Sequence, residues 1–483
     1  MEPLDQVYHC CFSTLLLNLC TQLRRLAIAG NAQDLENFSM GINKDNFTLD
    51  DIDIFLRQFD KNLIPPHAQS ERDARHAEMT IAQEKVLVAT QHLPNVLGMV
   101  RNDSSLRARF LDDVIDRVIA ALDGLVAWIE QYHLPSGFSE ILETYPRLEF
   151  SSTYLGSSFL LLNLARLGPR IWTAFFNSPA AVDLALAVWI TPIQTMRWQG
   201  EIEGPYPFCF TSMVLPPNLH CPTIWFMTEW LSSRKGRQVL VNRIAAQEGD
   251  SNTLADWIVC GATKRIALLV CLVDASIGRM APAAGAFHLL DIYQVIRHFD
   301  EEPVFDKAIR RMQAWTWIKT SIQTISDEGG DTEAVLTMIY TALFFARMSS
   351  KKKASDLYEL MSSCDVMAIF LRRIQQPSMT LRELTFAISV IKVLEVLCRR
   401  PNVPRWMAGL IRMCGGDAKM VESHPQEELA ESWRSFRTQL ESARRIARGI
   451  HPRLPIRKPD DGGDGPALER TRLYFCDNPS VRP

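Results

Sequence analysis

The sequence predicts an all-α protein built as an array of packed helices, and three observations carry this prediction. Apolar residues recur every three or four positions over long stretches, which is the spacing of one face of an α-helix. The alternation of apolar and polar residues that is typical of strands between hairpin turns is absent. Short segments rich in Gly, Pro or Asn separate the periodic stretches and suit loops or helix starts.

Three stretches show the helical spacing most clearly. The first covers residues 104–132, and its apolar positions are Leu106, Phe110, Val114, Val118, Leu122, Leu125, Ile129 and Tyr132. Further stripes run from Leu384 to Cys398 and from Leu429 to Ala447. Breaks are expected at residues 62–66, 134–137, 177–179, 328–331, 376–378 and 400–404. The predicted helices therefore follow one another through short connections and pack helix on helix.

This order of elements favours an irregular helical array, with an armadillo- or HEAT-like solenoid preferred over a helical bundle. No repeat of fixed length is present, which a diverged solenoid tolerates because each unit needs only an apolar face for its neighbours. An irregular bundle would give the same pattern and stays the alternative. The predicted organisation is an N-terminal helical region 1–190, a Pro-rich aromatic insertion 191–222, a C-terminal helical region 223–450 continuous with the first, and a flexible tail 451–483.

Composition and charge indicate a folded protein without a strong electrostatic field. Hydrophobic residues make up 47% of the 483 positions, and 52 basic against 55 acidic residues leave a net charge of −3. Such a balance does not steer the whole molecule toward nucleic acid or an anionic membrane. No apolar run approaches the roughly 18–20 residues of a membrane span. The 11 cysteines include no Cys-x-x-Cys pair, so we expect an intracellular protein of the cytoplasm or nucleus.

The segment 191–222 interrupts the helical pattern. It holds six prolines and the aromatic cluster Tyr206-Pro207-Phe208-Cys209-Phe210, so it cannot form one continuous helix. Long loops within compact domains are often functional. We therefore take Tyr206, Phe208 and Phe210, together with the nearby Trp225, as candidate partner-binding residues. An insertion that only caps neighbouring helices is the structural alternative.

Motifs of known catalytic or metal chemistry are missing from the chain. There is no His-Glu-x-x-His, no phosphate-binding Gly-rich loop with Lys and Ser or Thr, no Gly-x-Gly-x-x-Gly and no Gly-x-Ser-x-Gly. Cys209, His220 and Cys221 could approach one another, but zinc needs a fourth ligand. Cys10, Cys11 and Cys20 suit an apolar helix better than a metal. We predict no catalytic residue and no cofactor.

Two charged segments allow a functional and a structural interpretation. Lys351-Lys352-Lys353 could serve as a nuclear import signal or be a solvated turn. The stretch with Trp433 and Phe436 also carries Arg434, Arg437, Arg444, Arg445 and Arg448. These residues could form an anion-binding face, although interspersed Glu residues dilute the charge and cations are favoured near a helix C-terminus.

The end of the chain carries a family resemblance. Leu473-Tyr474-Phe475-Cys476-Asp477-Asn478-Pro479-Ser480 resembles the start of a MYND-type zinc finger, as found in many proteins of mushroom-type fungi. Residues 178–189 are similar to the helical segments that precede such fingers. The resemblance implies fingers that bind two zinc ions through Cys and His and usually dock Pro-rich peptides. Here Cys476 matches the first ligand, Val481 stands where the second Cys is expected, and the sequence stops at Pro483.

A finger truncated after its first ligand predicts no zinc, because structural zinc takes four ligands and supplies the folding energy of such a domain. Cys476 is then a vestigial first ligand in a truncated or degenerate family member, or in a gene model that ends early. We predict a non-enzymatic intracellular scaffold that binds a protein or peptide partner. The alternatives are a nucleic-acid-associated regulator related to MYND-finger proteins and, less favoured, an enzyme with a site between helices.

Overall fold

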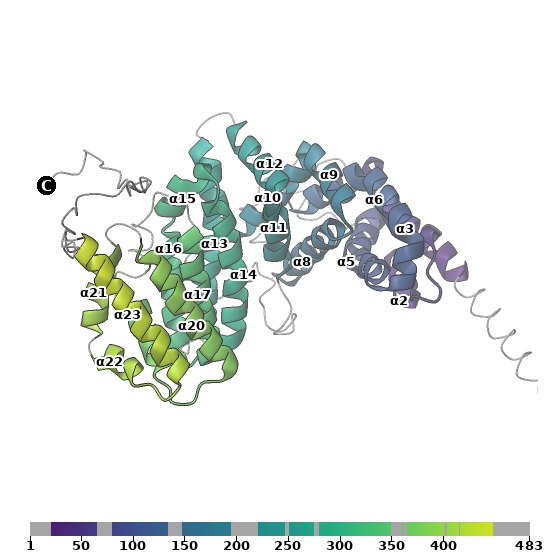
Figure 1. The fold of residues 1–483 in the computed structure, drawn as a ribbon. Helices are drawn as coiled ribbons and strands as arrows, with labels where there is room; N and C mark the ends of the chain where they lie inside the picture. The colour runs from purple at the N-terminus through teal and green to yellow at the C-terminus, as the bar shows by residue number, and fades with distance from the viewer. Residues whose placement is uncertain are drawn as a thin grey trace, which may run out of the picture.

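The computed structural model describes residues 21–64, 80–133, 147–194, 221–246, 251–274, 280–348, 360, 365–399, 403–414 and 416–447. Within these ranges all regular structure is helical and no strand is present, which confirms the all-α prediction. The chain follows the long axis of an elongated body, from purple elements at one end to yellow elements at the other (Figure 1).

The helices of the first half are of unequal length. In chain order they are α2 (Ala32–Gly41), α3 (Leu49–Leu56), α5 (Ile81–Asn102), α6 (Ser104–His133), α8 (Arg147–Ala165), α9 (Pro169–Asn177), α10 (Pro179–Gln194), α11 (Pro222–Ser232) and α12 (Arg234–Ala245). A further helical stretch covers residues 21–29, and short 3-10 helices cover Arg57–Phe59 and Lys61–Leu63.

The second half continues in the same manner. Its helices are α13 (Ser251–Val273), α14 (Pro282–Asp300), α15 (Asp306–Arg311), α16 (Ala314–Asp327), α17 (Thr332–Met348), α19 (Asp365–Ile374), α20 (Leu381–Leu397), α21 (Val403–Met413), α22 (Gly416–Glu422) and α23 (Glu427–Ala447). A 3-10 turn, Pro303–Phe305, precedes α15.

Side-chain caps determine where several of these helices begin. At α5 the Thr80 hydroxyl accepts the Gln83 N–H (3.3 Å), while the Gln83 side chain accepts the Thr80 N–H (2.8 Å). Thr380 and Glu383 form the same reciprocal pair at α20. Asp103 alone separates α5 from α6, and its carboxylate accepts the N–H groups of the first turn of α6. The local sequence therefore sets these starts.

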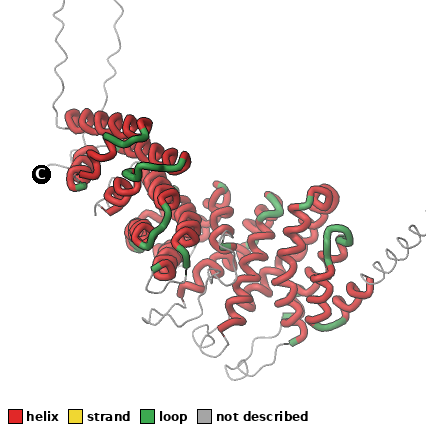
Figure 2. The backbone as a smooth tube through the Cα atoms, turned by 90° about the horizontal axis from the view of Figure 1, so that it is seen from below, coloured by secondary structure: helices red, strands yellow, loops and turns green. Residues whose placement is uncertain are grey.

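The helices pack in two rows along the molecule. In one row α2, α5, α8, α11, α14, α17, α20 and α23 each contact the next member. In the other row α3, α6, α10, α13, α16, α19 and α22 do the same. Figure 2 shows the helices lying side by side in a curved series. The shorter helices α9, α12, α15 and α21 lie against members of these rows.

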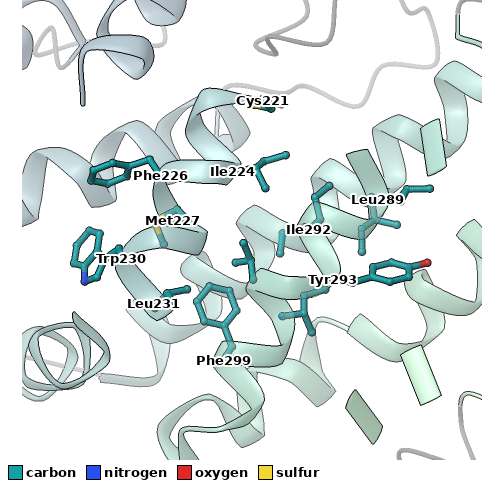
Figure 3. Close-up of a cluster of buried hydrophobic side chains, with 14 of the residues drawn as sticks. Cys221, Ile224, Phe226, Met227, Trp230, Leu231, Leu289, Ile292, Tyr293 and Phe299 are labelled. Atoms are coloured by element: carbon teal, nitrogen blue, oxygen red, sulfur yellow. The ribbon is translucent and has the colours of Figure 1, made fainter. Parts of the chain in front are cut away.

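One hydrophobic core extends through both rows. The buried apolar side chains form a single cluster that begins at Ala27 and ends at Leu440. Figure 3 shows a part of it, where Ile224 and Leu231 of α11 lie near Ile292 and Phe299 of α14. Burial of a continuous apolar strip between successive helices supplies the main stabilisation of such an array.

The boundaries of the predicted insertion need a correction. Residues 191–194 are the last turn of α10, and α11 begins at Pro222. A proline is tolerated at the first position of a helix, as at Pro222, because its missing N–H has no partner there in any case. Residues 195–220 and the tail 451–483 lie outside the described residues.

None of the described helices is by itself both long and apolar enough to cross a membrane. By length and composition alone α9 and α10 would qualify together, but they meet at a bend of 97°.

Candidate functional site

Of the four candidate partner-binding residues, the structure describes only Trp225. Tyr206, Phe208 and Phe210 lie outside the described residues. Trp225 is half-buried on α11, and the guanidinium carbon of Arg166 lies 3.5 Å from the centre of its ring. Its indole N–H donates to a carboxylate oxygen of Glu229 (3.1 Å). Trp225 therefore belongs to a charged cluster, where a cation stacked on an aromatic face is stabilised by the ring.

A hollow in the described part of the chain lies next to this cluster, between α5 and α8. It is a groove of about 650 Å³, within the range of about 300–1,000 Å³ that is usual for ligand sites. Small residues open it: Pro94 and Gly98 line it from α5, and Gly156 lines it from α8.

Side-chain amides line this groove. Gln91, Asn95 and Asn102 project from α5, and Asn163 projects from α8. The Asn163 amide donates to the Phe159 carbonyl one turn earlier (3.0 Å), while its oxygen lies 3.6 Å from where a Cβ of Gly98 would stand. For Gln91 and Asn95 the described residues offer no side-chain hydrogen bond, and both are exposed. These amides retain donors and acceptors for a ligand.

Two arginines, Arg101 and Arg166, lie close enough for their charges to interact, and we call them the arginine pair. Arg101 lines the groove in the last turn of α5, and Arg166 follows the end of α8. Burial lowers the pKa of both guanidinium groups, and the charge of Arg101 lowers that of Arg166 further. The negative charge of Glu229 raises both pKa values. Both remain cations at neutral pH.

Arg101 keeps unused hydrogen-bonding capacity. Its Nε donates to the Asn102 side chain (3.1 Å), but its Nη1 atom is buried and has no hydrogen-bond partner among the residues that the structure describes. No carboxylate of the described residues lies within ion-pairing distance of either member of the arginine pair. A desolvated donor without a partner is unfavourable, so the geometry suits an incoming anionic acceptor.

The other sequence-predicted sites are not assembled into a site by the described residues. Cys221 is buried at the start of α11, while Cys209 and His220 lie outside the described ranges. The same is true of Cys10, Cys11, Cys20, Lys351–Lys353 and Cys476. Within the described ranges, no group of three His, Cys, Asp or Glu side chains is placed to hold a metal ion.

The predicted anion-binding face on α23 has a different structure. Trp433 and Phe436 are fully buried with ring centres 5.2 Å apart, so neither can stack on a base. Arg434 pairs with Glu427, and Arg444 pairs with Glu441 at 2.7 Å. Arg437 also has an acidic neighbour, Glu422, at 3.7 Å. The aromatic stripe is therefore core, and Arg434, Arg437 and Arg444 beside it pair with acids. Arg448 lies outside the described residues.

Sequence reasoning missed the groove and the arginine pair. Arg101-Asn102-Asp103 resembles an ordinary polar helix end, and Gly156 is a single glycine in an apolar stretch. The only available signal was the succession of amides and small residues in Gln91–Asn102, which becomes meaningful once α8 is known to lie alongside.

Known proteins do not extend the description of this site: no family model, no curated protein and no solved structure matches the chain.

Proposed function

We propose that this protein is a non-enzymatic scaffold that binds an extended peptide segment of a partner protein in the groove between α5 and α8. The observation that carries the proposal is the set of amide side chains on the walls of an open groove. An amide both donates and accepts, as a peptide bond does, so it can pair with the backbone of an extended chain.

The dimensions of the groove support a short peptide. Gln91 and Asn102 both line it and are separated by eleven positions of α5, which corresponds to about 16 Å at about 1.5 Å per residue. An extended chain advances about 3.3 Å per residue, so about five residues would fill this length. Met99 and Phe159 also line the groove and would make apolar contacts with side chains of the peptide.

The chemistry of the lining favours binding over catalysis. Gln, Pro, Asn, Gly, Met, Arg and Phe line the groove, and Arg101 is the one ionisable residue among them. An arginine stays protonated and is a poor general base. The proposal therefore assigns recognition, not proton transfer, to this surface.

We further propose that the two rows of helices form an armadillo- or HEAT-like solenoid. Support comes from the regular contact of each helix with the next member of its own row, over the whole described length. Such arrays offer extended surfaces to partners because each unit contacts only its neighbours.

The test is a selection of displayed random twelve-residue peptides on the full chain, followed by binding measurements with the enriched peptides. Gly98→Trp should lower their affinity at least tenfold, because the indole would occupy the groove. The backbone tolerates a side chain there, since a Cβ would lie at an ordinary contact distance from Asn163.

The matched control is Gly409→Trp on α21, where a Cβ would meet nothing within 4 Å. It adds the same bulk to a helix far along the chain and should leave binding unchanged. If no peptide is enriched, or if enriched peptides bind the Gly98→Trp protein as well as the unmodified chain, the proposed function is wrong.

The resemblance of residues 473–480 to a MYND-type finger also stays a proposal. Metal analysis of the purified chain tests the expectation that Cys476 binds no structural zinc. Stoichiometric zinc that survives dialysis would contradict it.

A further inference from the structure

The charge at one end of the groove restricts which peptide would fit. The arginine pair brings two positive charges together, and Glu229 supplies one negative charge. Among the described residues no second carboxylate offsets the pair, so one positive charge is left uncompensated at a place where burial has removed part of its hydration. The cost of such a charge falls when an anion binds beside it.

The orientation of the groups also favours an anion at this point. The Trp225 ring lies against the Arg166 guanidinium, which limits its movement. Arg101 lines the groove, and its buried Nη1 atom has no hydrogen-bond partner among the described residues. Planar guanidinium groups match the two oxygens of a carboxylate. A purely structural role, in which arginines offset the negative C-terminal ends of α5 and α8, needs no buried free donor.

We propose that the arginine pair binds the carboxylate of an Asp or Glu side chain at one end of the extended peptide segment that occupies the groove. This assignment rests on the proposed peptide-binding function and specifies the partner as an acidic one. A carboxylate carries one negative charge, which matches the uncompensated charge. A phosphate monoester carries about −1.5 to −2 and would leave an excess.

The probes for the test are synthetic peptides that correspond to the selected sequences, with acetylated N-termini and amidated C-termini so that side chains supply the only carboxylates. We expect the selected sequences to share one Asp or Glu at one end of their common motif. Changing it to Asn or Gln should weaken binding to the unmodified protein by roughly ten- to hundredfold. Raising the salt concentration should weaken the acidic peptide more than its amide counterpart.

The protein variant for the test is Arg101→Gln/Arg166→Gln. The acidic peptide and its amide counterpart should bind this double variant with affinities equal within about twofold. The variant lacks the two positive charges by which the protein would distinguish a carboxylate from an amide. The control variant Arg405→Gln/Arg412→Gln on α21 changes the net charge equally and should keep the full difference. Thermal unfolding checks that both variants fold. If the first does not, the comparison of the two peptides and the salt series on the unmodified chain still decide the matter.

Several results would overturn the assignment while leaving the groove as a peptide site. Peptides that Gly98→Trp rejects but that share no acidic residue would do so. So would an equal loss from Glu→Gln in the unmodified and double-variant proteins, a preference of tenfold or more for phosphoserine at that position, or binding that requires a free C-terminus. Self-association of the chain that Gly98→Trp abolishes would identify a second copy as the occupant instead.

Discussion

Two interfaces within the same row of helices differ in what fills them. Between α11 and α14, large apolar side chains such as Ile224, Leu231 and Phe299 pack into continuous core (Figure 3). Between α5 and α8, small residues such as Gly98 and Gly156 leave a groove that amides line. Both pairs are consecutive neighbours in one row. The order in which the helices contact one another therefore does not decide where a ligand could bind. The size and polarity of the facing side chains decide it.

Thiol chemistry offers the largest contrast between core and groove. Cys398 is buried at the end of α20, and burial, with a smaller contribution from Glu395, raises its pKa to about 12. At pH 8 only about one molecule in ten thousand would carry the reactive thiolate, against about a quarter for an ordinary thiol of pKa about 8.5. Asn163→Cys in the groove should therefore react with iodoacetamide about a thousandfold faster than Cys398, as followed by peptide mass spectrometry. Equal rates in the folded protein would show that the groove is closed.

Removal of an apolar side chain should give the next largest difference, which is a difference in stability between the two interfaces. Ile292→Ala, at a fully buried position of α14, is expected to cost about 2–5 kcal/mol because it leaves a cavity. Met99→Ala changes a half-buried side chain at the open groove and should cost less than about 1 kcal/mol. Hydrogen exchange of the amides in each helix reports the local free energy of opening. A similar cost at both positions would mean that the groove wall is packed as core.

Replacement of a glycine by alanine adds a methyl group and tests whether space is available in the core and in the groove. In Gly261→Ala on α13 the new Cβ would stand 2.3 Å from the Trp189 indole nitrogen, which donates to the Ile258 carbonyl. We expect a loss of about 1–3 kcal/mol from this overpacking. Gly98→Ala meets only an ordinary contact and should be neutral or up to about 1 kcal/mol stabilising, since Ala favours the helix. Thermal unfolding measures both, and destabilisation by Gly98→Ala would contradict the open groove.

Removal of a polar group should give the smallest difference in stability between the core and the groove. The buried Tyr293 hydroxyl lies 2.6 Å from the Ser321 hydroxyl, and burial raises the pKa of Tyr293. Tyr293→Phe removes this bond and should cost about 1–2 kcal/mol in the free energy of unfolding. Asn95→Ala removes an exposed amide without a described hydrogen bond and should change stability by less than about 0.5 kcal/mol while weakening peptide binding. A large stability loss for Asn95→Ala would assign this amide a structural role.

Much of the helical structure was predictable from local pattern. The stripe that begins at Ser104 became α6, the stripe before Ala447 became α23, and the expected break near Asn177 separates α9 from α10. The candidate site was not predictable in the same way. Of the residues singled out beforehand, Trp225 alone lies in the described cluster beside the groove, and the aromatic–arginine stripe on α23 is mostly core and ion pairs.

The sequence by itself determined the class of structure, because helical spacing and capping residues such as Thr80 and Thr380 act over a few neighbouring positions. Only the tertiary structure decided where a ligand could bind. Gly98 and Gly156 lie on different helices, as do Arg101 and Arg166, and a hollow or a shared charge exists only once α8 lies against both α5 and α11. One sequence shows which residues share a helix face, but not which face of a distant helix will cover it.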